Sequence, residues 1–425
     1  MCEASLNRGL ILDESTLSKL RRNSPAGGWF PALRDLRWTI VECNLPYADL
    51  FFSANLRTVV ISTSLKVGAG VHRDILLAIA SAFSALPTLT LQYLDVDFYH
   101  RDIPWAPFED LLSSIVLRCG PPLTKFSSPP LLDAATNHLI HLPHLRSWVV
   151  KVPPPNYSTS SLPLTFPPLT EFTVGEDAAY EWLSLFKRLE APISTTRAVT
   201  PLSRVKESLE SLHIQRHPGA IFDDSFTSQI QIFHNLTYLN VGVRCHGNNN
   251  DRQCAFKLNN DNVTELAIAL PRLKSLLLGP PCFKNVCATT VACLLPISVY
   301  CLKLNRLEIH FNTANIIEDF KGISEDPQFQ ELQVLPRSRL HVLDVWEMPL
   351  TLDKPGIEAV ANGMANIFPS LDFCSGTLDF FPRTRGRNTW SRISRRIGEL
   401  TGNAVGECRL TVPFRLIHSC TEAHE

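Results

Sequence analysis

The sequence predicts an α/β protein in which parallel strands and helices alternate as one repeated unit. Two observations predict this class: a six-residue leucine pattern that recurs twelve times, and amphipathic segments between its copies. Composition is a third, because 31 Pro against 19 Gly inverts the usual order of these two residues. We therefore expect the 425 residues to form mainly a repeating array rather than two or three unrelated domains.

The repeated pattern is Leu-x-x-Leu/Phe-x-Val/Ile, usually with a Pro within the three preceding residues. Its fourth and sixth positions are apolar and flank one more polar residue, which is the period of a strand with one buried face. The first Leu turns the chain into that strand. Neighbouring copies lie 22 to 40 residues apart, and the last is decayed. The copies begin at Leu33, Leu56, Leu91, Leu123, Leu145, Leu169, Leu209, Leu236, Leu273, Leu304, Leu340 and Leu371.

The segments between copies repeat their apolar residues at spacings of three and four, which predicts helices. Several end at Leu-Pro or Phe-Pro, where proline stops the helix and the strand begins. The clearest helices are expected over 74–87, 131–143, 181–190, 261–271 and 356–369.

Strand, helix and strand at this spacing are typical of a leucine-rich-repeat solenoid, with strands on the concave face and helices on the convex face. An ordinary α/β domain whose strands look alike is the alternative. The turn asparagine of short repeats fits only at Asn312, so we expect an irregular arc.

The predicted organisation has three parts. Residues 1–29 are an N-terminal extension with one short helix, and residues 30–376 carry about twelve irregular repeats. Residues 377–425 are an Arg-rich tail with a candidate capping strand at 412–417. Six arginines around Trp390 favour a solvated tail that folding does not need, with a phosphate or RNA contact as the alternative.

The charge balance narrows the classes of partner. Forty basic and 41 acidic residues give a net charge of −1, which argues against protein-wide attraction to nucleic acid or an anionic membrane. No signal peptide or membrane-length apolar run occurs in the sequence. We expect a soluble chain in the cytoplasm or the nucleus, with no membrane partner and no nucleic acid.

No catalytic motif occurs, so the sequence predicts no enzyme, no cofactor and no metal site. Asp95 and Asp97 imitate an Asp-x-Asp metal site, but a solvated strand end explains them. The spacing of Cys282, Cys287, Cys293 and Cys301 favours buried free thiols over zinc. His138 and His141 could share a helix face, where a surface or partly packed position is expected.

The expected binding surface is the strand face, where the third and fifth positions of each repeat point outward beside the buried fourth and sixth. Tyr and Arg at such positions often anchor protein interfaces. The candidate partner-binding residues are Asp35, Arg37, Tyr93, Asp95, Lys125, Glu171, His213, Tyr238, Asn240, Arg306, Glu308 and Asp344.

Several blocks resemble the F-box/leucine-rich-repeat proteins of mushroom-forming fungi. They include FPALRDLRWTI (30–40), LPYADLFFSANLRTVVI (45–61) and IPWAPFEDLLSSIVLRCGPPLTKF (103–126), and the resemblance extends over about residues 30 to 371. In that family an F-box binds a Skp-type adaptor of a cullin–RING ubiquitin ligase, and the repeats present substrate. No F-box-like segment precedes Phe30, and the segment from Ile103 to Leu117 is expected to be a helix between repeats.

The resemblance thus implies the recognition half of an F-box receptor without the docking half. The sequence favours a non-catalytic protein-recognition module whose protein target is unknown. A Skp-type adaptor is an expected partner only if an F-box is encoded upstream. The alternatives are an inert or truncated gene product whose full-length form is a ligase substrate receptor, and an enzyme whose site no motif reveals.

Overall fold

The computed structural model describes the chain in segments that fall into two compact units. Unit 1 comprises Met1–Phe172, Val199–Val205 and Val412–Glu425, and unit 2 comprises Thr173–Ala198 and Lys206–Thr411. The described residues are 2–4, 10–12, 14–23, 29–40, 47, 50–53, 55–63, 79, 83, 90–98, 106–128, 131–150, 167–175, 179, 181–185, 203–215, 222–242, 257–279, 287–325, 327–332, 335–345, 350–375 and 386–402.

Unit 1 contains a short antiparallel pair and a set of parallel strands. The pair is β1 (Cys2–Ala4) with β2 (Leu10–Leu12), and α1 (Glu14–Arg22) follows it. The parallel strands pair with one another in chain order. They are β3 (Asp35–Ile40), β4 (Thr58–Thr63), β5 (Tyr93–Phe98), β6 (Lys125–Ser127) and β7 (Ser147–Val150), with α3 (Ala106–Arg118) and α4 (Asp133–Ile140) between them.

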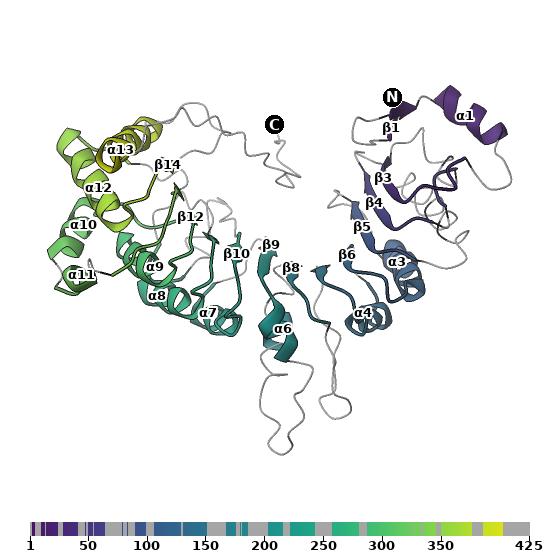
Figure 1. Cartoon of the computed structure of the whole chain (residues 1–425), viewed down its shortest axis with the longest axis horizontal. Helices are drawn as coiled ribbons and strands as arrows, with labels where there is room; N and C mark the ends of the chain where they lie inside the picture. The colour runs from purple at the N-terminus through teal and green to yellow at the C-terminus, as the bar shows by residue number, and fades with distance from the viewer. Residues whose placement is uncertain are drawn as a thin grey trace, which may run out of the picture. The chain divides into compact units, whose positions relative to one another are not determined.

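Unit 2 contains six parallel strands, again paired in chain order. Helices α7, α8 and α9 lie beside one another on one side of these strands (Figure 1). The strands are β9 (Ser211–Gln215), β10 (Tyr238–Val241), β11 (Ser275–Leu278), β12 (Arg306–Ile309), β13 (Val342–Asp344) and β14 (Phe373–Ser375).

The connections of unit 2 are mainly helical. They are α7 (Asp224–Ile230), α8 (Asn260–Ala269), the 3-10 turn η2 (Val291–Cys293), α9 (Leu294–Tyr300), α10 (Ile316–Glu325), α11 (Pro327–Leu332), α12 (Lys354–Ile367) and α13 (Gly386–Thr401). Strand β8 (Glu171–Gly175) and helix α6 (Ser203–Ser208) each cross the division between the units.

The predicted strands are confirmed at every copy of the leucine pattern. Each of the twelve strands β3 to β14 begins at the third position of its copy. The fourth position is buried in all twelve, and the sixth is buried wherever it is described. The first Leu is buried in every copy except Leu33, which is half-buried. The repeat therefore places three core side chains at each strand, and these positions define the α/β architecture.

Backbone hydrogen bonds link the copies at the second position of the pattern. The carbonyl of Arg57 accepts from the amides of Gln92 and Tyr93, and the carbonyl of Lys274 accepts from Asn305 and Arg306. The same double acceptance recurs between other neighbouring copies within each unit. Where one carbonyl accepts from two amides at the strand entrance, the next strand starts in register with its neighbour.

The predicted helices are confirmed where the structure describes them. Helix α12 begins as its sequence suggests, since the Asp353 side chain accepts from the Gly356 amide and Pro355 occupies the first turn. Helix α3 covers most of the segment from Ile103 to Leu117, which confirms a helix between strands. Within 74–87 only Ile79 and Phe83 are described, and both are helical and buried.

The solvated Arg-rich tail is wrong for residues 386–401, which form α13. Trp390, Ile393 and Ile397 lie on one face of this helix and are buried, and α13 packs on α12 and β14. The Ser394 hydroxyl accepts from the Cys374 amide of β14 at 3.2 Å. Of the described arginines, Arg392 and Arg395 are exposed, and Arg396 pairs with Glu358 of α12 at 2.7 Å, so positive charge does not prevent packing. The candidate capping strand at 412–417 lies outside the described residues.

Within the described part of the chain, no helix is both long enough and apolar enough to cross a membrane.

Candidate protein-binding surface

The side chains at the third and fifth positions of the leucine pattern form two rows that run across neighbouring strands. In unit 2 the fifth-position row reads His213, Asn240, Leu277, Glu308 and Asp344, because the strands β9 to β13 are paired at these residues. Parallel strands lie about 4.8 Å apart, so this row extends over about 19 Å. A row of this length offers varied chemistry to an extended partner without any cavity.

In unit 1 the candidate residues form a polar group on β5, β6 and β8. The Tyr93 hydroxyl donates to Asp95 Oδ2 at 2.9 Å, which holds the phenol against its own strand. Lys125 Nζ lies 3.9 Å from Glu171 Oε2, and both side chains are about half exposed. An exposed pair of this kind contributes little to stability but presents both charges to a partner.

The electrostatics of Tyr93 reflect this group. Burial, with Asp95 and its hydrogen bond adding to the effect, raises the pKa of the Tyr93 phenol well above its ordinary value of 10.0. Arg37 acts in the opposite direction, and Glu171 adds a small further increase. The phenol is therefore a neutral hydrogen-bond donor at any physiological pH. Asp35 and Arg37 themselves are exposed on β3.

In unit 2 the candidate residues gather on β10 and β12. Asn240 Nδ2 donates to the Tyr238 hydroxyl at 3.3 Å, which repeats the arrangement of Tyr93 and Asp95 at the same two strand positions. Burial raises the pKa of Tyr238, while its hydrogen bond with Asn240 opposes the rise. His213 on β9 and Asp344 on β13 are half-buried members of the same fifth-position row.

Glu308 differs from the predicted outward position, because its side chain is buried and only 4% of the residue is exposed. Arg306 donates to this carboxylate from two residues away on β12 and forms an ion pair with it. Burial raises the pKa of Glu308, and Arg306 partly offsets this rise. Strand β12 lies between β11 and β13, and the Arg306 side chain is more exposed than that of Glu308. A partner would therefore contact Arg306 and not a free carboxylate.

The cysteines considered for metal chemistry lie in the core wherever the structure describes them. Within the described residues, no group of three or more His, Cys, Asp and Glu could hold a metal ion. Cys287, Cys293 and Cys301 are buried free thiols, as predicted, while Cys282 lies outside the described residues. Burial raises the pKa of Cys301 from 9.0 to about 12. Burial raises the pKa of Cys293 as well, so Cys293 and Cys301 remain protonated and pack as apolar groups.

His138 and His141 each contact a backbone carbonyl instead of one another. His138 Nε2 lies 2.8 Å from the Cys119 carbonyl oxygen, and His141 Nδ1 lies 2.7 Å from the Asn137 carbonyl oxygen. These contacts match the expected partly packed and surface positions, respectively. Asp95 is engaged by Tyr93, and the side chain of Asp97 is not among those described.

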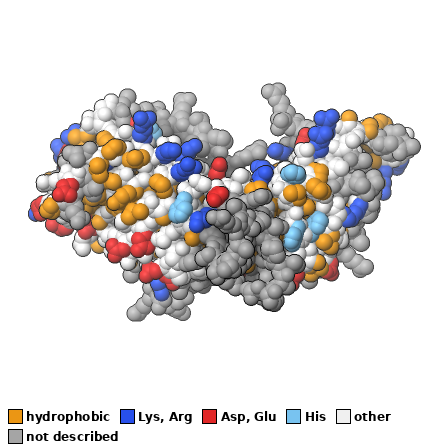
Figure 2. Space-filling model, turned by 60° about the horizontal axis from the view of Figure 1, so that its bottom comes forward, with side chains coloured by type: hydrophobic (Ala, Val, Ile, Leu, Met, Phe, Trp, Pro, Cys, Tyr) orange, Lys and Arg blue, Asp and Glu red, His pale blue; other side chains and the backbone are white. Residues whose placement is uncertain are grey.

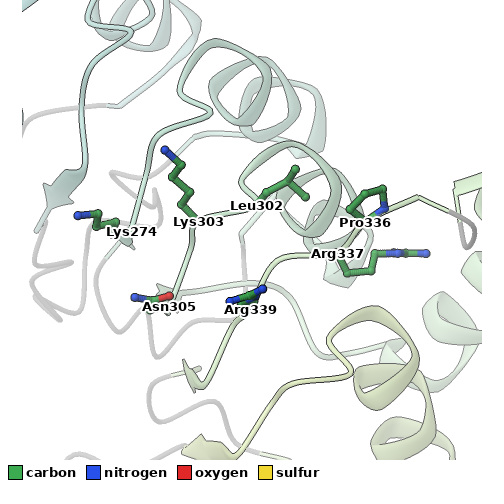
Figure 3. Close-up of a pocket in the computed structure, with 7 residues that line it drawn as sticks. All are labelled: Lys274, Leu302, Lys303, Asn305, Pro336, Arg337 and Arg339. Carbon is green, nitrogen blue, oxygen red and sulfur yellow. The ribbon is translucent and has the colours of Figure 1, made fainter.

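A basic hollow of about 530 Å³ lies where the chain enters β11, β12 and β13 (Figure 3). The leucine pattern alone did not predict this hollow, although the sequence carries a signal for it. Lys274 follows an entry Leu of the pattern, and Lys303 and Arg339 each precede one. Aligning the copies would have placed these cations side by side. The hollow is lined by Lys274, Leu302, Lys303, Asn305, Pro336, Arg337 and Arg339.

Comparison of the chain with known protein families and with curated proteins finds no match.

Proposed function

We propose that this chain is a non-catalytic protein-recognition module built as a leucine-rich-repeat solenoid. The observation that carries the proposal is the agreement between twelve sequence repeats and twelve strands, with variable side chains at the third and fifth positions. A repeated scaffold that holds varied polar side chains in register is typical of solenoids that bind proteins. Function depends on the residues of the binding surface and not on the fold alone, so both the repeated fold and the side chains of the strand face support the proposal.

Several features support the solenoid. Each copy of the repeat, a strand with its connecting segment, buries its apolar residues against the next copy. Repeat arrays form a continuous core in this way. The Asn312 side chain accepts from the Ala314 amide at 2.9 Å, as a turn asparagine of such repeats would. The connections differ in length and helicity from copy to copy, so the proposed solenoid is irregular.

The residue types on the strand face support recognition of a protein. Tyr93 and Tyr238 are half-buried aromatic side chains whose hydroxyl groups are held by neighbours at the fifth position. Such side chains lose little conformational freedom on binding and often dominate interface energies. Arg37 and Lys125 add exposed positive charge in unit 1, and charges at the rim of an interface contribute specificity.

The resemblance to fungal F-box/leucine-rich-repeat proteins supports a more specific proposal, that the module is the substrate-binding part of a ubiquitin-ligase receptor. The helix of the N-terminal extension is α1, of nine residues, and its Leu17 is buried within unit 1. Because Leu17 already packs internally, α1 offers little apolar surface to a Skp-type adaptor. Substrate binding by the repeats and docking to the ligase are thus separable, and the proposal concerns the first.

Affinity capture with surface variants tests the proposal. The purified full chain, immobilised in native lysate, should retain a specific protein. A face variant with Arg37→Glu and Lys125→Glu should lose it, while a control with Lys321→Glu and Lys354→Glu, on exposed positions of α10 and α12, should retain it. No specific protein, equal capture by both variants, or substrate turnover by the purified chain would contradict the proposal.

A further inference from the structure

The basic hollow of unit 2 combines concentrated positive charge with exposed apolar surface. Its lining includes four cations and no carboxylate. In Figure 3 Lys274, Asn305 and Arg339 lie on three neighbouring segments of the chain, and Lys303 is on the same segment as Asn305. The side chains of Lys274 and Arg337 extend outward on opposite sides of this group. We infer that this hollow is the docking site for an acidic segment of a protein partner. The inference rests on the proposed function, which it makes more specific.

The residues that carry these charges are neighbours because the strands that follow them are paired in register. Ser275 on β11 pairs with Arg306 on β12, and Arg306 pairs with Val342 on β13. The residues just before these strands are therefore neighbours too, at about the 4.8 Å spacing of strands. Lys303 and Arg339 occupy the same place in two consecutive copies, and Arg272 occupies it in the copy before them. Like charges at this spacing repel, and a partner carboxylate would relieve the repulsion.

In the part of the chain that the structure describes, no carboxylate neutralises this cluster. Within the described residues, Lys274, Lys303 and Arg339 form no ion pair, and all three side chains are exposed. The carboxylates on nearby strands are engaged elsewhere. Glu308 pairs with Arg306, and Asp372 Oδ2 lies 2.8 Å from His341 Nδ1. The positive charge of the hollow is thus available to an external anion.

The surface around the hollow is also apolar. Leu302 lines the hollow and is 43% exposed, and Tyr300, at the end of α9, is 41% exposed. Leu335, next to the lining residue Pro336, is 43% exposed. These are three of the eight large exposed hydrophobic side chains among the described residues. Figure 2 shows hydrophobic side chains gathered on this unit, with Lys and Arg side chains among their neighbours.

This combination favours a peptide over a nucleic acid. A single-stranded nucleic acid needs several aromatic side chains on which successive bases stack. None lines the hollow, and Tyr300 is the one large exposed aromatic side chain among the described residues of unit 2. An acidic peptide with a hydrophobic residue can satisfy both features, because its carboxylates meet Lys303 and Arg339 while its apolar side chain packs on Leu302 and Pro336. The hollow also lies one residue from the strand face, since Lys274 precedes Ser275 of β11. A protein bound to that face could extend such a segment into it.

Fluorescence anisotropy with the full chain tests the inference. The probe is a fluorescein-labelled peptide of Glu and Ser residues around a single Leu, and its control carries Gln in place of each Glu. We expect the acidic peptide to bind and the Gln peptide to bind at least about tenfold more weakly, which corresponds to about 1.4 kcal/mol. Binding should also weaken with added salt. No binding of the acidic peptide, or equal binding of both peptides, overturns the inference.

Two matched charge reversals locate the site. Lys303→Glu with Arg339→Glu should weaken binding by about tenfold or more. Lys321→Glu with Lys354→Glu makes the same change of net charge on α10 and α12 and should leave affinity unchanged. Equal affinity of the two variants, or tighter binding of single-stranded polyuridine than of the peptide, overturns the inference.

The outcomes separate this inference from the proposed function. If the strand-face variant loses a protein partner while the acidic peptide fails to bind, the docking site is wrong and the proposed function stands. If the wild-type chain captures no protein at all, the proposed function fails, whatever the peptide does.

Discussion

Replacing Trp390 by Ala should strongly destabilise the C-terminal end of unit 2. Trp390 is 1% exposed and lies on the face of α13 that packs on α12 and β14. A buried Trp removes about 150–250 Å² from water, and at about 25 cal/mol per Å² this area corresponds to roughly 4–6 kcal/mol as an upper bound. Substitutions of buried aromatic residues by Ala cost about 3–5 kcal/mol. We therefore expect a loss of about 3–5 kcal/mol.

Arg392 supplies the matched control on the same helix. Its side chain is exposed on the opposite face of α13, so Arg392→Ala should change the free energy of unfolding by no more than about 0.5 kcal/mol. Comparing the two variants separates the packing of α13 from its charge and its helix propensity.

Urea denaturation and hydrogen exchange give complementary readouts. The Trp390→Ala variant should unfold at lower urea, and its amides in α12 and β14 should exchange faster. Exchange matters because the end of a repeat array can unfold locally before the remainder. Equal urea midpoints and equal α12 exchange for the two variants would refute the packing role of α13. They would restore the solvated tail expected from the sequence.

Three further predictions concern the core, the thiols and the ligase. Leu236→Ala and Leu273→Ala should each cost about 2–5 kcal/mol in urea unfolding, whereas Leu132→Ala at an exposed position should cost far less; similar values for all three would refute the repeat core. Burial raises the pKa of Cys119 and Cys301 from 9.0 to about 12. Between about pH 9 and pH 12 only the unfolded chain loses these thiol protons, so the free energy of unfolding should fall as the pH rises through this range. If the fall is equally steep after Cys301→Ala, the buried thiols are not its cause. The purified 425-residue chain should not bind a Skp-type adaptor in calorimetry, and micromolar or tighter affinity would contradict the prediction.

The strands could be predicted because their signal is local. Alternation of buried and outward residues within six positions specifies a strand, and each copy of the leucine pattern carries it. The N-terminal helix was also predicted, but the antiparallel pair of β1 and β2 was not, because these two short strands lie outside the repeated leucine pattern. Strands of the same length were recognised at β6, β13 and β14 because each carries a copy of that pattern.

Helix α13 was missed although its pattern is present. Trp390, Ile393 and Ile397 are spaced by three and four residues, the period of a helix with one apolar face. The six arginines of the segment suggested repulsion and a solvated tail, but the three whose side chains are described, Arg392, Arg395 and Arg396, lie outside the buried face of the helix. Apolar spacing therefore predicted this element better than net charge did.

The candidate binding surface could be predicted only in part. The third and fifth positions follow directly from the strand period, whereas the burial of Glu308 depends on the strands beside it. The basic hollow depends on side chains 29 to 65 residues apart in sequence, Lys274 to Lys303 and Lys274 to Arg339. Only the in-register pairing of strands brings such residues together.

Site-specific photo-crosslinking tests whether the strand face recognises a protein. A photoreactive phenylalanine analogue would replace Tyr93 on β5, Tyr238 on β10 or, as the control, Leu117 on the exposed side of α3. After irradiation in native lysate, the account predicts that the two strand positions crosslink to the same protein and that the α3 position does not. Crosslinking from Leu117 alone, or no crosslinked protein at Tyr93 and Tyr238, would contradict it.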